Sequence, residues 1–176
     1  MIGGPITGGV LLLFVFCYCG FVTAVLLLPL LREQQRILTD CAIIYFSGTG
    51  VTHQLASAIR QGAQSHTEGE VTLCRILGEH IGQGRYVNDQ QMAVLDNADI
   101  IYFGSPTYMG GPAAQFKAFA DATSERWESQ RWAGKLAAGF TCGSNAGGDQ
   151  LATLQYFHIL ASQPVSYTHL TLPTKA

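Results

Sequence analysis

A chain of 176 residues is long enough to form one domain with a full core. Its formal net charge is −2 and only 12% of its side chains are charged, so it lacks the positive charge that nucleic-acid binding requires. Its five cysteines include no CxxC pair and its five histidines show no metal-binding spacing. These counts argue against a metal site and indicate a reduced, cytoplasmic protein.

The amino-terminal segment differs in composition from the rest, because residues 1–31 include no charged side chain. Residues 9–31 are numerous enough for an apolar helix that crosses a bilayer, and the basic Arg32 and Arg36 would then keep the following chain on the cytoplasmic side of the membrane. We expect residues 1–38 to be either such a membrane anchor or the product of a start codon assigned too far upstream. A secretory signal is not expected, since a basic start is missing.

Residues 39–163 alternate between two kinds of apolar pattern. Short runs rich in β-branched and aromatic residues predict strands buried on both faces, at 41–46, 71–76, 99–106 and 135–141. Helical spacing predicts helices at 52–63, 89–98, 112–123 (with Pro112 at the first position) and 149–163. The stretch 77–88 is expected to be a loop. Four βα units predict an α/β fold with a doubly wound parallel sheet and ligands at the carboxyl ends of its strands.

The last 13 residues, PVSYTHLTLPTKA at 164–176, lack any core periodicity. The letters VSYTHL within them resemble the translation of a sequencing adapter. We therefore expect residues 164–176 to be a non-native tail and the domain at 39–163 to be truncated at its carboxyl end.

Three strands are followed by loops rich in Gly, Ser and Thr, at 47–52, 105–111 and 142–148. In the first, SGTGVT, small residues let backbone amides approach a ligand, and the following helix adds partial positive charge. This favours a phosphate held by amides and by the hydroxyls of Ser47, Thr49 and Thr52. The alternative is a simple helix cap and turn. The spacing fits neither a Walker A motif nor a dinucleotide fingerprint.

The same letters resemble the phosphate loop [ST]-x-T-G-x-T of flavodoxins. The chain is also similar to flavodoxin-like NAD(P)H:quinone oxidoreductases of the WrbA type. The similarity rests on five features that follow in the same order: GSPTYMGG, the helix QFKAFAD, a Trp, the pair GK and the loop CGSNAGG. The resemblance covers about residues 40–163. It implies a three-layer flavodoxin-like sheet with strand order 2-1-3-4, whose fifth strand would be lost with the carboxyl end, leaving an exposed edge.

The resemblance implies FMN as cofactor and NAD(P)H as co-substrate, with no acid–base catalyst. The FMN phosphate would be held by Ser47, Gly48, Thr49, Gly50, Val51 and Thr52. One side of the flavin ring would be lined by Ser105, Pro106, Thr107, Tyr108, Met109 and Gly110. The other side would be lined by Cys142, Gly143, Ser144, Asn145 and Gly147.

Two aromatic side chains have alternative interpretations. Trp127 corresponds to a Trp that in these relatives reaches a neighbouring subunit's flavin, which implies a dimer or tetramer; otherwise it is a partly buried core aromatic. His53 either donates to the phosphate or is an exposed helix residue, and the second interpretation is favoured.

The function implied is an FMN-binding oxidoreductase that passes electrons from NAD(P)H to a quinone. The alternatives are a flavodoxin-type electron carrier that docks on protein partners and a plain FMN reductase. Residues 39–163 carry 11 acidic and 7 basic side chains. This modest negative charge favours the enzyme, because carriers of that kind are strongly acidic and are steered to basic partners.

Overall fold

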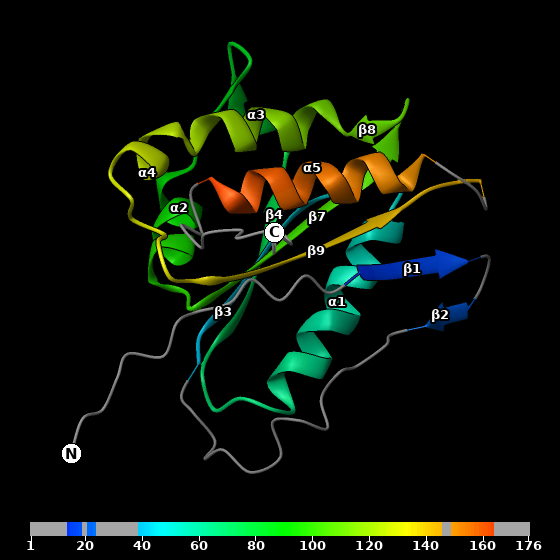
Figure 1. The fold of residues 1–176 in the computed structure, drawn as a ribbon, viewed down its shortest axis with the longest axis horizontal. Coiled ribbons are helices and arrows are strands. Elements are labelled where there is room, and N and C mark those ends of the chain that lie inside the picture. The colour runs from blue at the N-terminus through cyan, green and yellow to red at the C-terminus, as the bar shows by residue number, and fades with distance from the viewer. Residues whose placement is uncertain (1–13, 19–20, 24–38, 146–148, 164–176) are drawn as a thin grey trace, which may run out of the picture.

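Parallel strands form the middle layer of the protein (Figure 1). In the computed structural model, which describes residues 14–18, 21–23, 39–145 and 149–163, the central strands have the order β4-β3-β7-β9. This confirms the expected order 2-1-3-4. Their bounds are β3 Cys41–Phe46, β4 Val71–Ile76, β7 Ile100–Tyr108 and β9 Leu136–Cys142.

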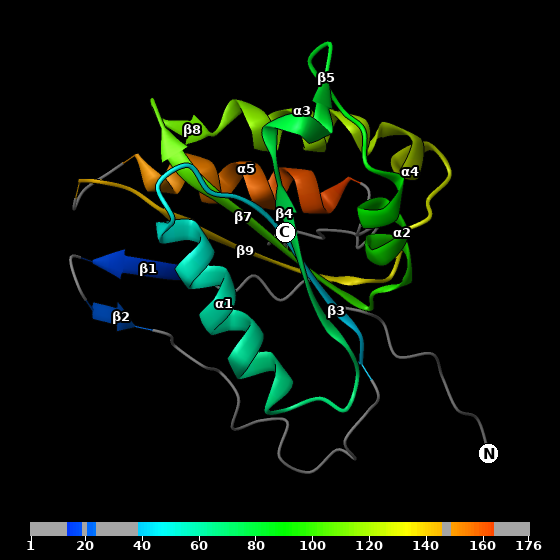
Figure 2. The ribbon, with the colours of Figure 1, turned by 180° about the vertical axis from the view of Figure 1, so that it is seen from behind.

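Helices cover both faces of this sheet, so the predicted three layers are present (Figure 2). The long helices are α1 Val51–Gln64, α2 Asp89–Asn97, α3 Ala114–Ala122 and α5 Gln150–Ser162. Along β3, Ile43 packs into the core under α1, whereas Ile44 packs into the larger core under α2, α3 and α5. The alternation of side chains along each strand thus supplies two separate cores.

The stretch between β4 and α2 is not a plain loop. It contains a short 3₁₀ helix at Gly78–His80 and a small hairpin of β5 (Ile81–Gly82) and β6 (Arg85–Tyr86). Tyr86 is buried, and its ring meets the ring of Phe119 edge-on at 5.5 Å between centroids. Burial of this one aromatic side chain anchors the hairpin to α3.

The second Gly-rich stretch is a hairpin in which β7 turns back as β8 (Gly111–Pro112). Met109 and Gly110 form the turn with φ angles of 49° and 77°, the left-handed geometry that suits two-residue hairpins. The expectation that Pro112 begins a helix is therefore wrong. Pro112 lies in a short edge strand, where a missing N–H is tolerated, and α3 begins at Ala114. A further short helix, α4 (Ser124–Glu128), follows α3.

Near the amino terminus, two strands replace the expected apolar helix. β1 (Phe14–Tyr18) pairs in parallel with β9 and antiparallel with β2 (Phe21–Thr23). The outer edge of β9 offers backbone N–H and C=O groups for pairing, and the backbone of β1 pairs with this edge. Aromatic and β-branched residues, which favour strands, make up most of β1. The expected exposed edge is thus partly covered.

The remaining residues of the predicted segment 1–38, and the tail at 164–176, lie outside the described residues. No helix in the described ranges is long and apolar enough to cross a membrane.

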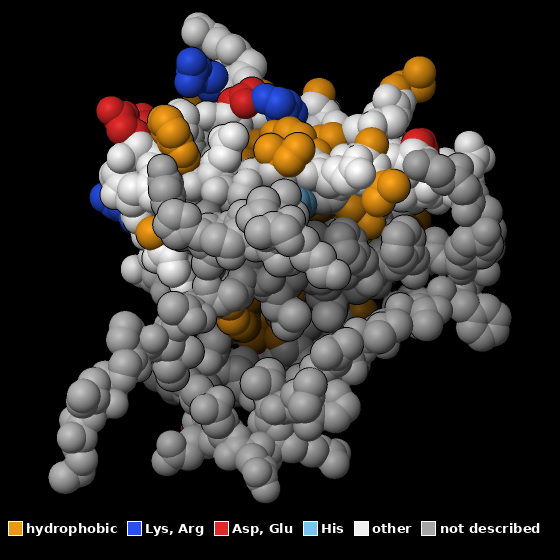
Figure 3. Space-filling model, in the orientation of Figure 1, with side chains coloured by type: hydrophobic (Ala, Val, Ile, Leu, Met, Phe, Trp, Pro, Cys, Tyr) orange, Lys and Arg blue, Asp and Glu red, His pale blue; other side chains and the backbone are white. Residues whose placement is uncertain are grey.

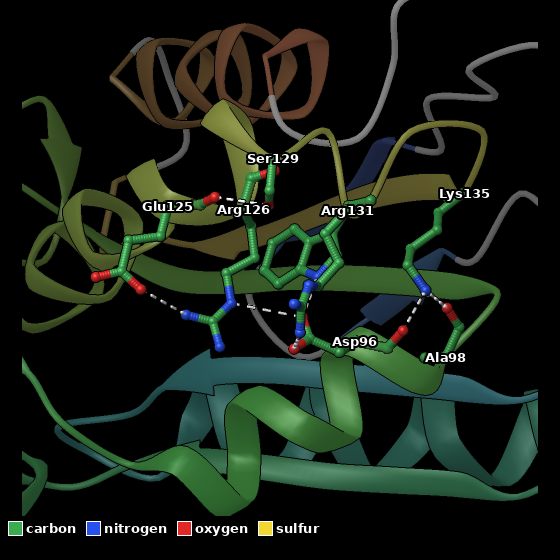
Figure 4. A network of polar contacts seen from close by, with 8 residues as sticks. Asp96, Ala98, Glu125, Arg126, Ser129, Arg131 and Lys135 are labelled. Carbon is green, nitrogen blue, oxygen red and sulfur yellow. Dashed lines mark hydrogen bonds and ion pairs between the residues drawn. The ribbon is translucent and has the colours of Figure 1, made fainter.

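A partly buried carboxylate ties α2 to the segment that leads into β9 (Figure 4). Asp96 accepts hydrogen bonds from Trp132 Nε1 at 2.6 Å and from Arg131 Nη1 at 3.1 Å, and Arg126 Nε lies 3.5 Å from its Oδ1. Burial alone would raise the pKa of Asp96, but these contacts outweigh burial and lower the pKa. Lys135, from the Gly-Lys pair of the motif series, donates to two backbone carbonyls at the end of α2. This part of the motif series therefore has a structural role.

Candidate functional site

The three Gly-rich loops meet at the edge of the sheet where the parallel strands end. Figure 2 shows the start of α1, which follows the first loop, beside β8 of the second. Two contacts join them: Tyr108 of the second loop reaches Gly48 of the first, and Cys142 of the third reaches Thr52 at the start of α1. The sheet thus brings together residues that are up to 90 positions apart in the sequence.

In the first loop, Ser47 organises the backbone. The side chain of Ser47 is buried, and its Oγ accepts hydrogen bonds from the amides of Gly50 at 3.1 Å and His53 at 3.2 Å. Gly50 has a φ of 96°, a left-handed conformation that favours glycine. The expected hydroxyl of Ser47 therefore acts as a cap within the loop.

The neighbouring amides of the first loop have no such partner. Within the described residues, no acceptor is recorded for the amides of Gly48, Thr49, Val51 and Thr52. The loop is exposed at Gly48, Thr49 and Val51. Free amides at the start of a helix offer donors and partial positive charge to an anion.

The hydroxyl of Thr52 is directed elsewhere. Thr52 is buried, and its Oγ1 lies 3.2 Å from the Sγ of Cys142. This contact fixes the start of α1 against the end of β9. Thr49 is therefore the remaining exposed hydroxyl of the three that the sequence assigns to a phosphate.

A cation that sequence reasoning missed lies beside the first loop. Arg75, near the end of β4, donates from Nη2 to the carbonyl of Ser47 at 3.0 Å. No carboxylate among the described residues lies within 4 Å of the Arg75 guanidinium. Arg75 pairs with Tyr45 in the sheet and so lies near the edge where β3 ends, a position that depends on strand register and that no sequence motif signals.

The favoured interpretation of His53 as an exposed helix residue is wrong, because His53 is partly buried and contacts Tyr45. Its Nδ1 lies 2.6 Å from the phenolic oxygen of Tyr45, and the two rings stack at 5.8 Å between centroids. Burial raises the pKa of Tyr45, while the charge of Arg75 opposes that shift. The phenol therefore stays protonated and can donate to His53.

The second loop divides into a buried and an exposed half. Ser105, Pro106 and Thr107 are buried within β7, whereas Tyr108, Met109 and Gly110 are exposed at the turn. The Ser105 Oγ accepts from the Ala113 amide at 2.9 Å, which closes the base of the hairpin. Only the exposed half can offer side chains to a ligand.

In the third loop, Cys142 is buried at the end of β9, while Gly143, Ser144 and Asn145 are exposed. The carbonyl of Asn145 accepts a hydrogen bond from Gln150 Nε2 at 2.6 Å, so the first turn of α5 braces this loop. Gly147 lies outside the described residues.

A separate groove of about 300 Å³ lies between α3, α4 and α5, at the end of these helices away from the three loops. Trp127 lines it with 50% of its surface exposed, so the interpretation as a core aromatic is wrong. Figure 3 shows hydrophobic side chains exposed on this face. Ile159, which also lines the groove, is exposed. The implied oligomer stays a prediction.

Comparison with known proteins supports the same fold. The sequence matches the family described as NADPH-dependent FMN reductase over residues 43–173. A solved structure of a flavodoxin, WrbA-like protein from Agrobacterium tumefaciens is similar, with 42% identity and a TM-score of 0.64, over 73% of this chain and 74% of that one.

Two curated relatives have different names. A flavodoxin, FldP, from Pseudomonas aeruginosa (strain UCBPP-PA14) is 38% identical over 72% of this chain and 62% of its own length. An NAD(P)H dehydrogenase (quinone) from Syntrophus aciditrophicus (strain SB) is 30% identical over 66% of this chain and 64% of its own length. The chain thus spans somewhat less than two thirds of these relatives.

Proposed function

Because this chain belongs to the NADPH-dependent FMN reductase family, we propose that it binds FMN and passes electrons from NAD(P)H to a quinone. The single observation that carries the proposal is the set of four unpartnered amides in the first loop, next to the guanidinium of Arg75. These groups suit a phosphate dianion. The name of the Syntrophus relative supports the quinone as acceptor.

The first loop has the donors that a single phosphate requires. Two of the four amides lie in the loop before α1 and two lie in its first turn, the exposed Thr49 adds a hydroxyl, and Arg75 adds a positive charge. Hydrogen bonds of this kind to a charged acceptor are about twice as strong as neutral ones. This set of donors in the first loop suits the one phosphate of a mononucleotide such as FMN.

The exposed ends of the second and third loops would then flank the flavin ring. FMN, when bound, supplies the reversible two-electron chemistry by which a hydride from NAD(P)H is accepted and a quinone is reduced. The protein's contribution is to orient the ring: the phenol of Tyr108 and the exposed backbone of Met109 and Gly110 would lie on one side, and Gly143 to Asn145 on the other. The scheme requires no acid or base from the described residues.

An electron-carrier function is the alternative, favoured by one observation: the relative with 38% identity is named a flavodoxin. Against it, the domain has only four more acidic than basic side chains between residues 39 and 163. A carrier relies on a strongly charged docking face for its on-rate.

Steady-state oxidation of NADH and of NADPH by the FMN-loaded protein, with and without benzoquinone, separates the two functions. Oxidation that depends on benzoquinone is expected for the enzyme. A yellow, FMN-loaded protein that oxidises neither nucleotide under any of these conditions would contradict the enzyme and favour the carrier.

A further inference from the structure

Behind the exposed turn of the second loop, four buried residues from three elements form a chain of hydrogen bonds. Thr107 in β7 contacts Thr141 in β9 at 2.9 Å and Thr153 in α5 at 2.8 Å, measured between hydroxyl oxygens. Thr141 in turn donates to the carbonyl of Ser105 at 2.7 Å. All four residues are at most 8% exposed, so water cannot substitute for these partners.

The direction of the hydrogen bonds follows from the number of protons. A threonine hydroxyl has one proton to donate. Thr141 uses its proton on the Ser105 carbonyl, so Thr107 must donate to Thr141. The proton of Thr107 is then used, and Thr153 must donate to Thr107. The chain therefore starts at α5 and ends on the backbone of β7.

The hydrogen bonds of α5 reach both the second and the third loop, which would flank the flavin ring. Thr107 directly precedes Tyr108 and pairs with Pro112 across the hairpin. Gln150, in the first turn of the same helix, holds the carbonyl of Asn145 in the third loop. One helical turn thus carries a donor to each loop, with Thr153 and Gln150 three residues apart and close to the same face.

We propose that Thr153 is a positioning residue for the flavin ring, which it orients indirectly by donating to Thr107 at the base of the second loop. The inference rests on the proposed function, because it concerns the FMN site. Thr153 touches no ligand itself. Neither Thr153 nor Thr107 forms a hydrogen bond with residues 47–52, so the loss of Thr153 should act on the ring site rather than directly on the first loop.

Titration with FMN and with riboflavin tests this proposal, because riboflavin has the same ring but no phosphate. In the full chain, Thr153→Val removes the donor while keeping the shape of the side chain. It is expected to weaken both ligands by about the same factor, roughly tenfold for one lost hydrogen bond, and to shift the visible absorption of bound FMN. Thr153→Ser keeps the hydroxyl and is expected to bind both ligands as the wild type does.

Thr123→Val is the matched control. Thr123 is also buried, and its Oγ1 donates to the Ala120 carbonyl at 2.7 Å, away from the three loops. This variant is expected to lower the melting temperature without changing either affinity. A purely structural role for Thr153 would make Thr153→Val behave in the same way, and that result would overturn the proposal.

Three other outcomes would also overturn the proposal. Loss of FMN affinity with unchanged riboflavin affinity in Thr153→Val would assign the effect to the phosphate and overturn the proposal. If Thr153→Val does not fold, a tenfold loss of affinity for FMN and riboflavin in Thr153→Ser would overturn the proposal. Wild-type protein that takes up no FMN would instead reject the proposed function, and this inference with it.

Discussion

The phenolic oxygen of Tyr108 lies against Gly48, so close that a β-carbon on Gly48 would come within 2.6 Å of it. Tyr108 belongs to the second loop and Gly48 to the first, and no side chain separates them. The Tyr108 ring can therefore take this position against the first loop only because residue 48 has no side chain. This contact joins the predicted ring site to the predicted phosphate site.

Replacing Gly48 with Ala should push Tyr108 away from the first loop and weaken FMN binding by about tenfold. The tip of a Tyr side chain can move, so the fold should persist with a small change in melting temperature. Gly62→Ala is the control, because Gly62 lies in α1 with open space around it; that change should stabilise the helix by about 0.5–1 kcal/mol and leave FMN binding unchanged. Equal FMN affinities in the Gly48→Ala and wild-type proteins would contradict the contact.

Replacing Arg75 with Gln should weaken FMN binding without affecting riboflavin, because the guanidinium lies beside the loop proposed for the phosphate. The loss expected for one charged donor is about 1.5–3 kcal/mol. It should diminish as salt is added, since salt screens charges at an exposed site. Arg60→Gln, on the exposed surface of α1, should change neither affinity. An equal loss for both ligands would show that Arg75 acts only through the shape of the loop.

Thr107→Val should destabilise the protein more than Thr153→Val does, because the hydrogen bonds run from Thr153 to Thr107. Removing Thr107 leaves the buried hydroxyl proton of Thr153 without an acceptor, which costs about 1–3 kcal/mol. Removing Thr153 leaves Thr107 still donating to Thr141, with only an acceptor position unfilled. Urea unfolding of the two variants without ligand measures the difference, and the opposite order of stabilities would reverse the assigned direction.

Asp96 should make stability depend on pH in the acid range. Its pKa is lowered in the folded protein by contacts with Trp132, Arg126 and Arg131, although burial acts in the opposite direction. A carboxylate with a lowered pKa adds stability above its ordinary pKa of about 4 and loses it as the pH falls through the folded value. Asp96→Asn should therefore be less stable than wild type at pH 7, with a gap that narrows below pH of about 4.

Chemical denaturation from pH 7 to pH 3 checks this expectation. Asp121→Asn is the control, because Asp121 forms an ion pair with Lys117 that is about half exposed on both sides and such pairs contribute little. A constant gap between Asp96→Asn and wild type across that range would contradict the role of ionisation.

The central strands were predictable because burial on both faces demands continuous runs of apolar residues. The bounds of β3 and β4 agree with the sequence prediction at both ends. Pro112 was misassigned because proline suits both a helix start and an edge strand. The left-handed turn at Met109 and Gly110 decides between the two, and only the Gly of that pair signals it in the sequence.

The candidate site was predictable as three loops but not as a network. Ser47 and Thr52 were expected to face a ligand, yet their hydroxyls contact Gly50, His53 and Cys142. Arg75 and Thr153 come from elements with no recognisable motif. Their roles depend on strand register and on how α5 packs, which are tertiary properties that local sequence patterns do not encode.

The central claim is that backbone amides of the first loop, together with Arg75, hold the phosphate of FMN. Calorimetric titration of the full chain with FMN and with riboflavin tests it most directly. The account predicts that FMN binds at least about a hundredfold more tightly, because only FMN carries the dianion. Equal affinities for the two ligands, or no uptake of FMN at all, would contradict it.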